Sequence, residues 1–144
     1  IAIETMSAGD SLDLHDGAVI EILAVGERGC AYLIRYGDFR LFMTHGEDTD
    51  VIQTAAANTI LREVSAAVLP GSGSIALNPD VLLETLNPSL VLLVVKPGSG
   101  RDIPHPLILE ALSPRTILRT DQHGWIKLDT DGRILSITAE YNPE

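Results

Sequence analysis

Alternating apolar and polar residues run through the first third of the chain. They fall in four short segments: residues 11–14, 18–24, 31–36 and 39–44. The segments are joined by short stretches rich in Gly and Asp, such as His15-Asp16-Gly17 and Gly37-Asp38. Alternation with a period of two, broken by tight turns, is typical of antiparallel hairpins. Residues 1–44 are therefore predicted to form an antiparallel β-meander.

After residue 44, helical and strand-like patterns alternate along the chain. Three segments are predicted helices: residues 49–62, 79–86 and 106–112. Three apolar segments are predicted strands: residues 65–69, 90–95 and 116–119. Asp48 or Thr49 is the expected N-cap of the first helix, and Asn78 that of the second, because short polar side chains cap exposed amides. Residues 45–119 are therefore predicted to form αβ units.

The last segment, residues 120–144, is predicted to end the chain as a hairpin. Residues 121–124 are a predicted turn, and Asp131-Gly132 is a second turn between strands 125–129 and 133–138. Antiparallel strands followed by αβ units predict an α/β (α+β) fold. We expect one domain over residues 1–144, with a mixed β-sheet, antiparallel hairpins and about three helices.

Composition and charge limit the kind of core that this chain can have and the kinds of partner that it is expected to bind. Hydrophobic residues make up 45% of the chain but aromatic residues only 4%, which predicts an aliphatic core. The net charge of −10 repels phosphate backbones, so we do not expect nucleic acid as a partner. The apolar run 90–95 is too short to cross a bilayer, so no membrane contact is expected of this segment. Cys30 is the only cysteine, which excludes an internal disulfide, and its alternating run predicts a small buried side chain.

Residues 71–74 read Gly-Ser-Gly-Ser and are here called the Gly-Ser loop. They follow strand 65–69 and Pro70, at the edge of the sheet where α/β proteins place ligands. None of their side chains can bind a metal ion strongly or abstract a proton at neutral pH. Their amides could cradle an anion, but no lysine follows to complete a nucleotide loop. Ser72 or Ser74 would need a neighbouring base, such as His105, to act as a nucleophile.

His45, Glu47 and Asp48 are the densest cluster of potential metal ligands. Imidazole and carboxylate groups suit zinc or manganese, yet three ligands from one short loop rarely close a coordination shell. Acidic residues are also favoured at a helix N-terminus, and this structural interpretation is the preferred one. His105, between two prolines, either caps or packs at a helix start or belongs to a site. His15 and His123 lie in predicted turns and are expected to be exposed.

Four blocks of sequence occur in the order of a known family. They are Leu-Phe-Met-Thr at 41–44, Leu-Pro-Gly-Ser-Gly-Ser at 69–74, His105-Pro106, and Arg-Thr-Asp-Gln-His-Gly-Trp-Ile at 119–126. Together they resemble the second half of the metallo-β-lactamase-fold domain of the ComEC-type DNA-internalisation competence proteins. The resemblance covers about residues 8–138. It implies the C-terminal half of an αββα sandwich, and it implies that this half has an apolar sheet face to be covered.

The departures from the family pattern concern the metal ligands. Where the family has Val-Pro-His-His-Gly-Ser, its paired histidines fall on Gly71 and Ser72 of this chain. Its Thr-Gly-Asp aspartate falls on Gly46 or, if His45 is an insertion, on Glu47. Only His105 keeps its type, and the family's His-x-His-x-Asp-His run has no counterpart. The resemblance thus implies a vestigial site at Thr44, Gly71, Ser72, Gly73, Ser74, His105 and Thr120.

A two-metal hydrolase needs imidazole and carboxylate ligands that these positions lack, so we expect no catalytic residue and no cofactor. The leading hypothesis is a non-catalytic metallo-β-lactamase-like domain with a structural or protein-interaction role. Its partner would be a second copy or the remainder of a longer competence or DNA-uptake protein, which implies an extracytoplasmic location. One alternative is a metal-dependent phosphodiesterase or nuclease using Zn or Mn, with Glu47 and His105 contributing and the missing ligands supplied by another segment or subunit. Another is an anion- or nucleotide-binding module built on the Gly-Ser loop.

Overall fold

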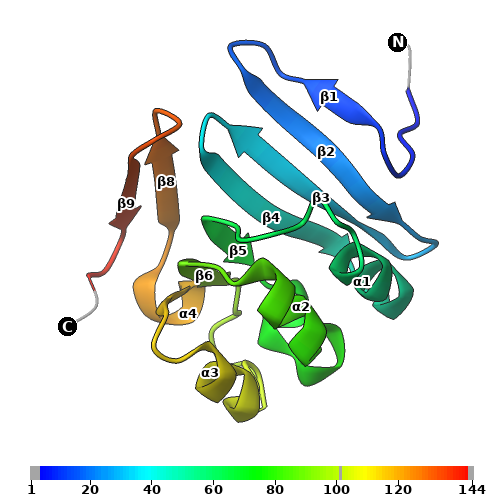
Figure 1. Ribbon diagram of the computed structural model, residues 1–144. Helices are drawn as coiled ribbons and strands as arrows, with labels where there is room; N and C mark the ends of the chain where they lie inside the picture. The colour runs from blue at the N-terminus through cyan, green and yellow to red at the C-terminus, as the bar shows by residue number, and fades with distance from the viewer. Residues whose placement is uncertain (1–3, 101, 143–144) are drawn as a thin grey trace.

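A computed structural model describes residues 4–100 and 102–142 of the chain. Its centre is a seven-stranded sheet in the order β1-β2-β3-β4-β5-β6-β7, and β8 and β9 form a separate two-stranded sheet (Figure 1). The strands are β1 (Ser11–Asp13), β2 (Ala18–Val25), β3 (Gly29–Tyr36), β4 (Phe39–Gly46), β5 (Ala66–Val68), β6 (Leu90–Leu93), β7 (Thr116–Arg119), β8 (Ile126–Thr130) and β9 (Leu135–Ala139). The described helices are α1 (Thr49–Ala56), α2 (Asp80–Leu86), α3 (Pro106–Leu112) and α4 (Thr120–His123).

The large sheet is mixed. Strands β1 to β4 pair antiparallel, as the predicted meander requires, and β4 to β7 pair parallel. Parallel neighbours need a crossover, and α1, α2 and α3 lie in these three connections. The predicted α/β (α+β) class, with a mixed sheet and antiparallel hairpins, is therefore confirmed.

Helices cover one face of the large sheet. Leu33, Phe42 and Val91 point to this face and are fully buried beneath residues of α1, α2 and α3. This cluster is almost wholly aliphatic, as the low aromatic content predicted. Because strand side chains alternate between faces, the neighbours of these residues in each strand point to the opposite side.

The opposite face is covered in part by the β8–β9 hairpin. Phe39, Leu90, Leu92 and Leu118 are buried on this side, together with Ala66, and Ile126, Leu128 and Leu135 of the hairpin pack against them. The hairpin tip reaches the turn between β3 and β4, where the amide of Asp38 donates to the carbonyl of Gly132 at 2.6 Å. The hairpin and the helices therefore lie on opposite sides of the sheet (Figure 1).

Several local predictions were wrong. Helix α1 ends at Ala56 rather than near residue 62, because the chain turns at Asn58 and places Leu61 in the core. Residues 120–123 form a one-turn helix rather than the turn of a hairpin. Cys30 is only half-buried, on the sheet face opposite the helices. Within the part of the chain described, no helix has the length and apolar character that crossing a bilayer requires.

Candidate functional site

The C-terminal end of β4 and the Gly-Ser loop meet across a shallow pocket. The pocket has a volume of about 420 Å³ and is lined by residues 43–47, 68–72 and Val94. Strands β4 and β5 are parallel neighbours, so the segments that follow them leave the same edge of the sheet. The fold thus brings Thr44, His45 and Glu47 to the same pocket as Gly71 and Ser72.

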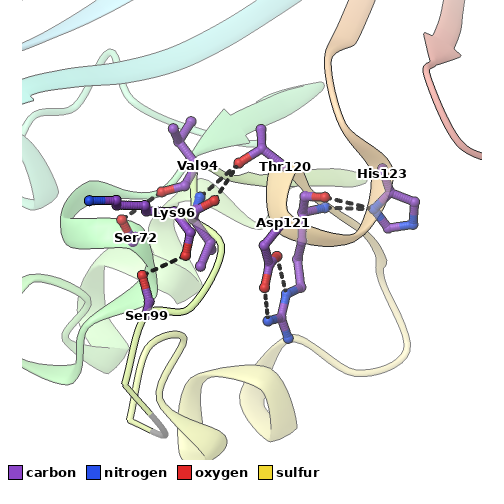
Figure 2. Close-up of polar contacts among 9 residues, drawn as sticks. Ser72, Val94, Lys96, Ser99, Thr120, Asp121 and His123 are labelled. Atoms are coloured by element: carbon purple, nitrogen blue, oxygen red, sulfur yellow. Dashed lines mark hydrogen bonds and ion pairs between the residues drawn. The ribbon is translucent and has the colours of Figure 1, made fainter.

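The Gly-Ser loop has an unusual backbone. Gly71 and Ser72 have φ angles of 56° and 54°, in the left-handed region that favours glycine. A Cβ atom on Gly71 would lie 2.5 Å from Ser74 Oγ and 2.7 Å from Leu77 Cδ1. Ser72 Oγ donates a hydrogen bond of 2.6 Å to the carbonyl of Val94 (Figure 2). A side chain at position 71 would therefore require Ser74 and Leu77 to shift, and the hydroxyl at position 72 is already engaged.

Asn78 holds this loop from the protein interior. Its side-chain amide is buried and donates to the carbonyls of Pro70 at 3.0 Å and Ser74 at 2.7 Å. The predicted role of Asn78 as the N-cap of α2 is therefore wrong. Pro79 takes the N-cap position without a side-chain hydrogen bond. The side chain turns inward because the tight turns of the loop leave carbonyls that need a donor away from water.

The backbone of His105 contacts the Gly-Ser loop, but its imidazole ring is engaged at the start of α3. Its amide donates to the carbonyl of Gly73 at 3.0 Å, and its Nδ1 accepts from the amide of Leu107 at 3.3 Å. The imidazole is thus the N-cap of α3, which is the structural interpretation considered from the sequence. Residue 105 does not line the pocket between β4 and the Gly-Ser loop.

The three residues of the predicted His45, Glu47 and Asp48 cluster do not share one environment. His45 and Glu47 are exposed, whereas Asp48 is buried as the N-cap of α1. Its carboxylate accepts from the amides of Arg28 at 3.2 Å, Asp50 at 3.1 Å and Val51 at 3.4 Å. The amide of Arg28, foremost, lowers the pKa of Asp48. Asp48 therefore joins the β2–β3 turn to α1 and has no oxygen directed at the pocket's other candidates.

Thr120 and the residues around it form a polar junction that sequence reasoning largely missed. Thr120 Oγ1 donates to the carbonyl of Val95 and accepts from its amide, both at 2.9 Å (Figure 2). Arg119 makes two hydrogen bonds to Asp121, at 3.0 and 2.6 Å, and the guanidinium lowers the pKa of this carboxyl. This junction fixes α4 against the segment that follows β6.

His123, expected to be exposed, is 6% exposed and belongs to this junction. Its Nδ1 lies 2.9 Å from the amide nitrogen and 3.0 Å from the carbonyl oxygen of Arg119, so the ring is held against the backbone at the start of α4. The prediction failed because an Asp-Gly-rich stretch favours an exposed turn, whereas here the stretch winds into a helix that turns the ring inward. The one indication in the sequence that His123 belongs to a structured region was its place in the block 119–126, which carries part of the family resemblance.

The residues present do not fit a two-metal hydrolase centre. Among residues 4–100 and 102–142, no three His, Cys, Asp or Glu side chains come together as a group that could hold a metal ion. At the two positions where the resemblance implies histidines, Gly71 has no side chain and the hydroxyl of Ser72 is bonded to the carbonyl of Val94. What remains at the pocket is one imidazole and one carboxylate, on an exposed strand end.

Comparisons with known proteins assign no family. No protein-family model matches this chain, and no curated protein matches it.

Proposed function

We propose that this chain is a non-catalytic metallo-β-lactamase-like domain with a structural or protein-interaction role, in the soluble part of a competence or DNA-uptake protein. The observation that carries the proposal is an apolar sheet face that neither the helices nor the β8–β9 hairpin covers. Cross-strand pairs identify this face: Ile20 lies beside Ile34, Ile22 beside Tyr32, and Tyr32 beside Met43. These side chains are only half-buried, although they continue the face that the hairpin covers over the neighbouring strands.

Contiguous apolar surface of this kind is typical of an interaction site in a protein that is otherwise charged on its surface. The Gly-Ser loop supports a non-catalytic role, because Gly71 and Ser72 supply no imidazole and the Ser72 hydroxyl is bonded to the carbonyl of Val94. A role in presenting a surface needs no chemistry at this pocket. The resemblance and the open apolar face both support the proposed scaffold role.

The test measures whether the face is covered or accessible in solution. Light scattering gives the mass of the purified protein, and an apolar dye that fluoresces on hydrophobic surfaces reports accessible patches. We expect either a mass above that of one chain or dye binding by a monomer. A monomer that binds no dye would contradict the proposal, because its apolar face would then be covered by the chain itself.

A second candidate function is a metal-dependent phosphodiesterase or nuclease. It is favoured by one observation: His45 and Glu47 are both exposed at the rim of the same pocket. Under this hypothesis another segment or subunit supplies the remaining ligands. Metal content of the purified protein and cleavage of single-stranded DNA with added Mn²⁺ distinguish the two functions. Cleavage that is lost in Glu47→Gln but retained in Glu63→Gln, at an exposed position remote from the pocket, would favour the hydrolase.

A further inference from the structure

We propose that the uncovered apolar face binds a second copy of this chain, face to face, in a weak symmetric dimer. The inference rests on the proposed function and names the partner. The surface, here called the β2–β4 face, consists of the outward side chains that the hairpin leaves open on three adjacent strands: Ala18, Ile20, Ile22, Val25, Cys30, Tyr32, Ile34, Tyr36, Met43 and His45. Val25 is 52% exposed and His45 is exposed, and the others are half-buried.

The distribution of charge favours this surface for contact between identical chains. Two copies each carry a net charge of −10 and repel one another at most orientations. The β2–β4 face, however, has no carboxylate, ammonium or guanidinium group, and its one imidazole, His45, lies at its rim opposite Cys30. The charged residues of these strands, including the Glu21–Arg35 ion pair at 2.6 Å, point to the other side of the sheet. Packing the two faces together therefore removes apolar surface from water without burying an unpaired charge.

The β8–β9 hairpin supports a sheet, rather than an irregular segment, as the occupant. It already forms a second layer on this side of the large sheet, over β4 to β7. Sheets stack about 10 Å apart, so a partner sheet on β2–β4 would lie in the same layer as the hairpin. The contact would continue an interface that the chain already makes with itself. Tyr32 and Tyr36 supply the large amphipathic side chains that interfaces favour.

The area of the β2–β4 face indicates what class of interface the dimer would have. Each of the three strands has 8 residues. At about 3.3 Å per residue and about 4.8 Å between strands, they cover roughly 26 by 14 Å, and the hairpin already covers the end of β4 at Phe39 and Leu41. Two copies of the remaining face therefore bury on the order of 1,000 Å² or less, the range of weak and transient interfaces. We therefore expect a dimer that dissociates on dilution in the micromolar range.

Sedimentation velocity over a concentration series tests the proposal. We expect the wild-type mass to rise from one chain to two and then to stay constant, because a symmetric contact closes at two copies. Ile34→Glu places a carboxylate at the centre of the face and should weaken the dimer at least tenfold. The matched control is Val81→Glu, at a side chain on α2 that is 52% exposed, and it should leave the dimer unchanged. Circular dichroism shows whether each variant is folded.

A second readout needs no variant. Cys30 is the only cysteine and lies on the face, so its rate of alkylation should fall as the wild-type protein dimerises. A dimer with protected Cys30 supports the proposal even where Ile34→Glu does not fold. Three results would overturn it: a monomer throughout the series, a mass that keeps rising beyond two chains, or a dimer in which Cys30 alkylation does not change. A monomer that binds the apolar dye overturns the second copy as partner while leaving the proposed function in place.

Discussion

Replacing Asn78 tests whether its side chain holds the Gly-Ser loop or caps α2. Asn78→Ala removes the two hydrogen bonds to Pro70 and Ser74 and leaves both carbonyls without this donor. Each bond contributes about 1 kcal/mol, and a buried group left unpaired costs a further 1 kcal/mol or so. Asn78 Oδ1 has no donor among the described residues, so deleting it offsets part of the loss. We expect a net destabilisation of about 2 kcal/mol, equivalent to a fall in Tm of about 4–8 °C.

Asn78→Asp distinguishes the two roles, because aspartate is as good an N-cap as asparagine. In the observed geometry the variant instead directs a carboxylate at two carbonyl oxygens that now lie 2.7 and 3.0 Å from the donor. It should therefore be less stable than Asn78→Ala at neutral pH. Repulsion and burial raise the pKa of the new carboxyl in the folded state. The destabilisation is thus full at neutral pH and should shrink as the pH falls through that raised pKa, since the protonated group can donate to one carbonyl.

Urea unfolding followed by circular dichroism, at neutral and at mildly acidic pH, gives the free energy of unfolding for each variant. Gln122→Ala, which removes an exposed amide, is the matched control and should change stability by less than about 0.5 kcal/mol. If Asn78→Asp were as stable as the wild type at neutral pH, the interior role of Asn78 would be refuted and the N-cap role restored.

Three further predictions concern the Gly-Ser loop and the polar junction around Thr120. Gly71→Ala should destabilise the protein by about 2 kcal/mol, because it adds to the cost of the left-handed backbone a contact that the side chains of Ser74 and Leu77 must relieve by shifting. Gly98→Ala is the matched control, because Gly98 has a φ of 79° and the added Cβ would have no atom within 4 Å. The difference between the urea midpoints of the two variants therefore measures the cost of the side-chain contact at position 71. Asp121 has a folded-state pKa lowered chiefly by the hydrogen-bonded guanidinium beside it. Its stabilising contribution should be present above the unfolded pKa and lost as the pH falls through the folded one, and acid melts of Asp121→Asn should lack this component. His123→Ala should cost about 2 kcal/mol in the same urea assay, whereas His15→Ala should be nearly neutral; equal effects would contradict the buried position of His123.

Much of the fold could be predicted because its determinants are local. The alternating runs before residue 44 and the Asp131-Gly132 turn each contain the pattern and the turn residues of a hairpin, and both hairpins form. The apolar run predicted as strand 90–95 forms β6, and all four residues of β6 are buried. Helix lengths were predicted less well. The periodicity after Asp48 continues past Ala56, but burial of Leu61 requires the chain to leave the helix earlier.

The candidate site could be predicted in part. The sequence placed Thr44, Gly71 and Ser72 at one edge of a sheet, and the fold brings them to one pocket. It did not reveal that the ring of His105 caps α3 or that Asn78 turns inward. Both depend on which backbone groups lack partners once the chain has folded, and these groups are distant from the pattern that defines each element.

Taken alone, the sequence determined most of the elements, their order and the residue types of the Gly-Ser loop. Those follow from side-chain periodicity and residue identity, which are properties of short segments. Only the tertiary structure decided that His123 is buried, that Ser74 and Leu77 pack against Gly71, and that the hairpin covers one end of β4 but leaves the β2–β4 face open. These depend on which surfaces meet, because burial and steric contact are set by residues far apart in the chain.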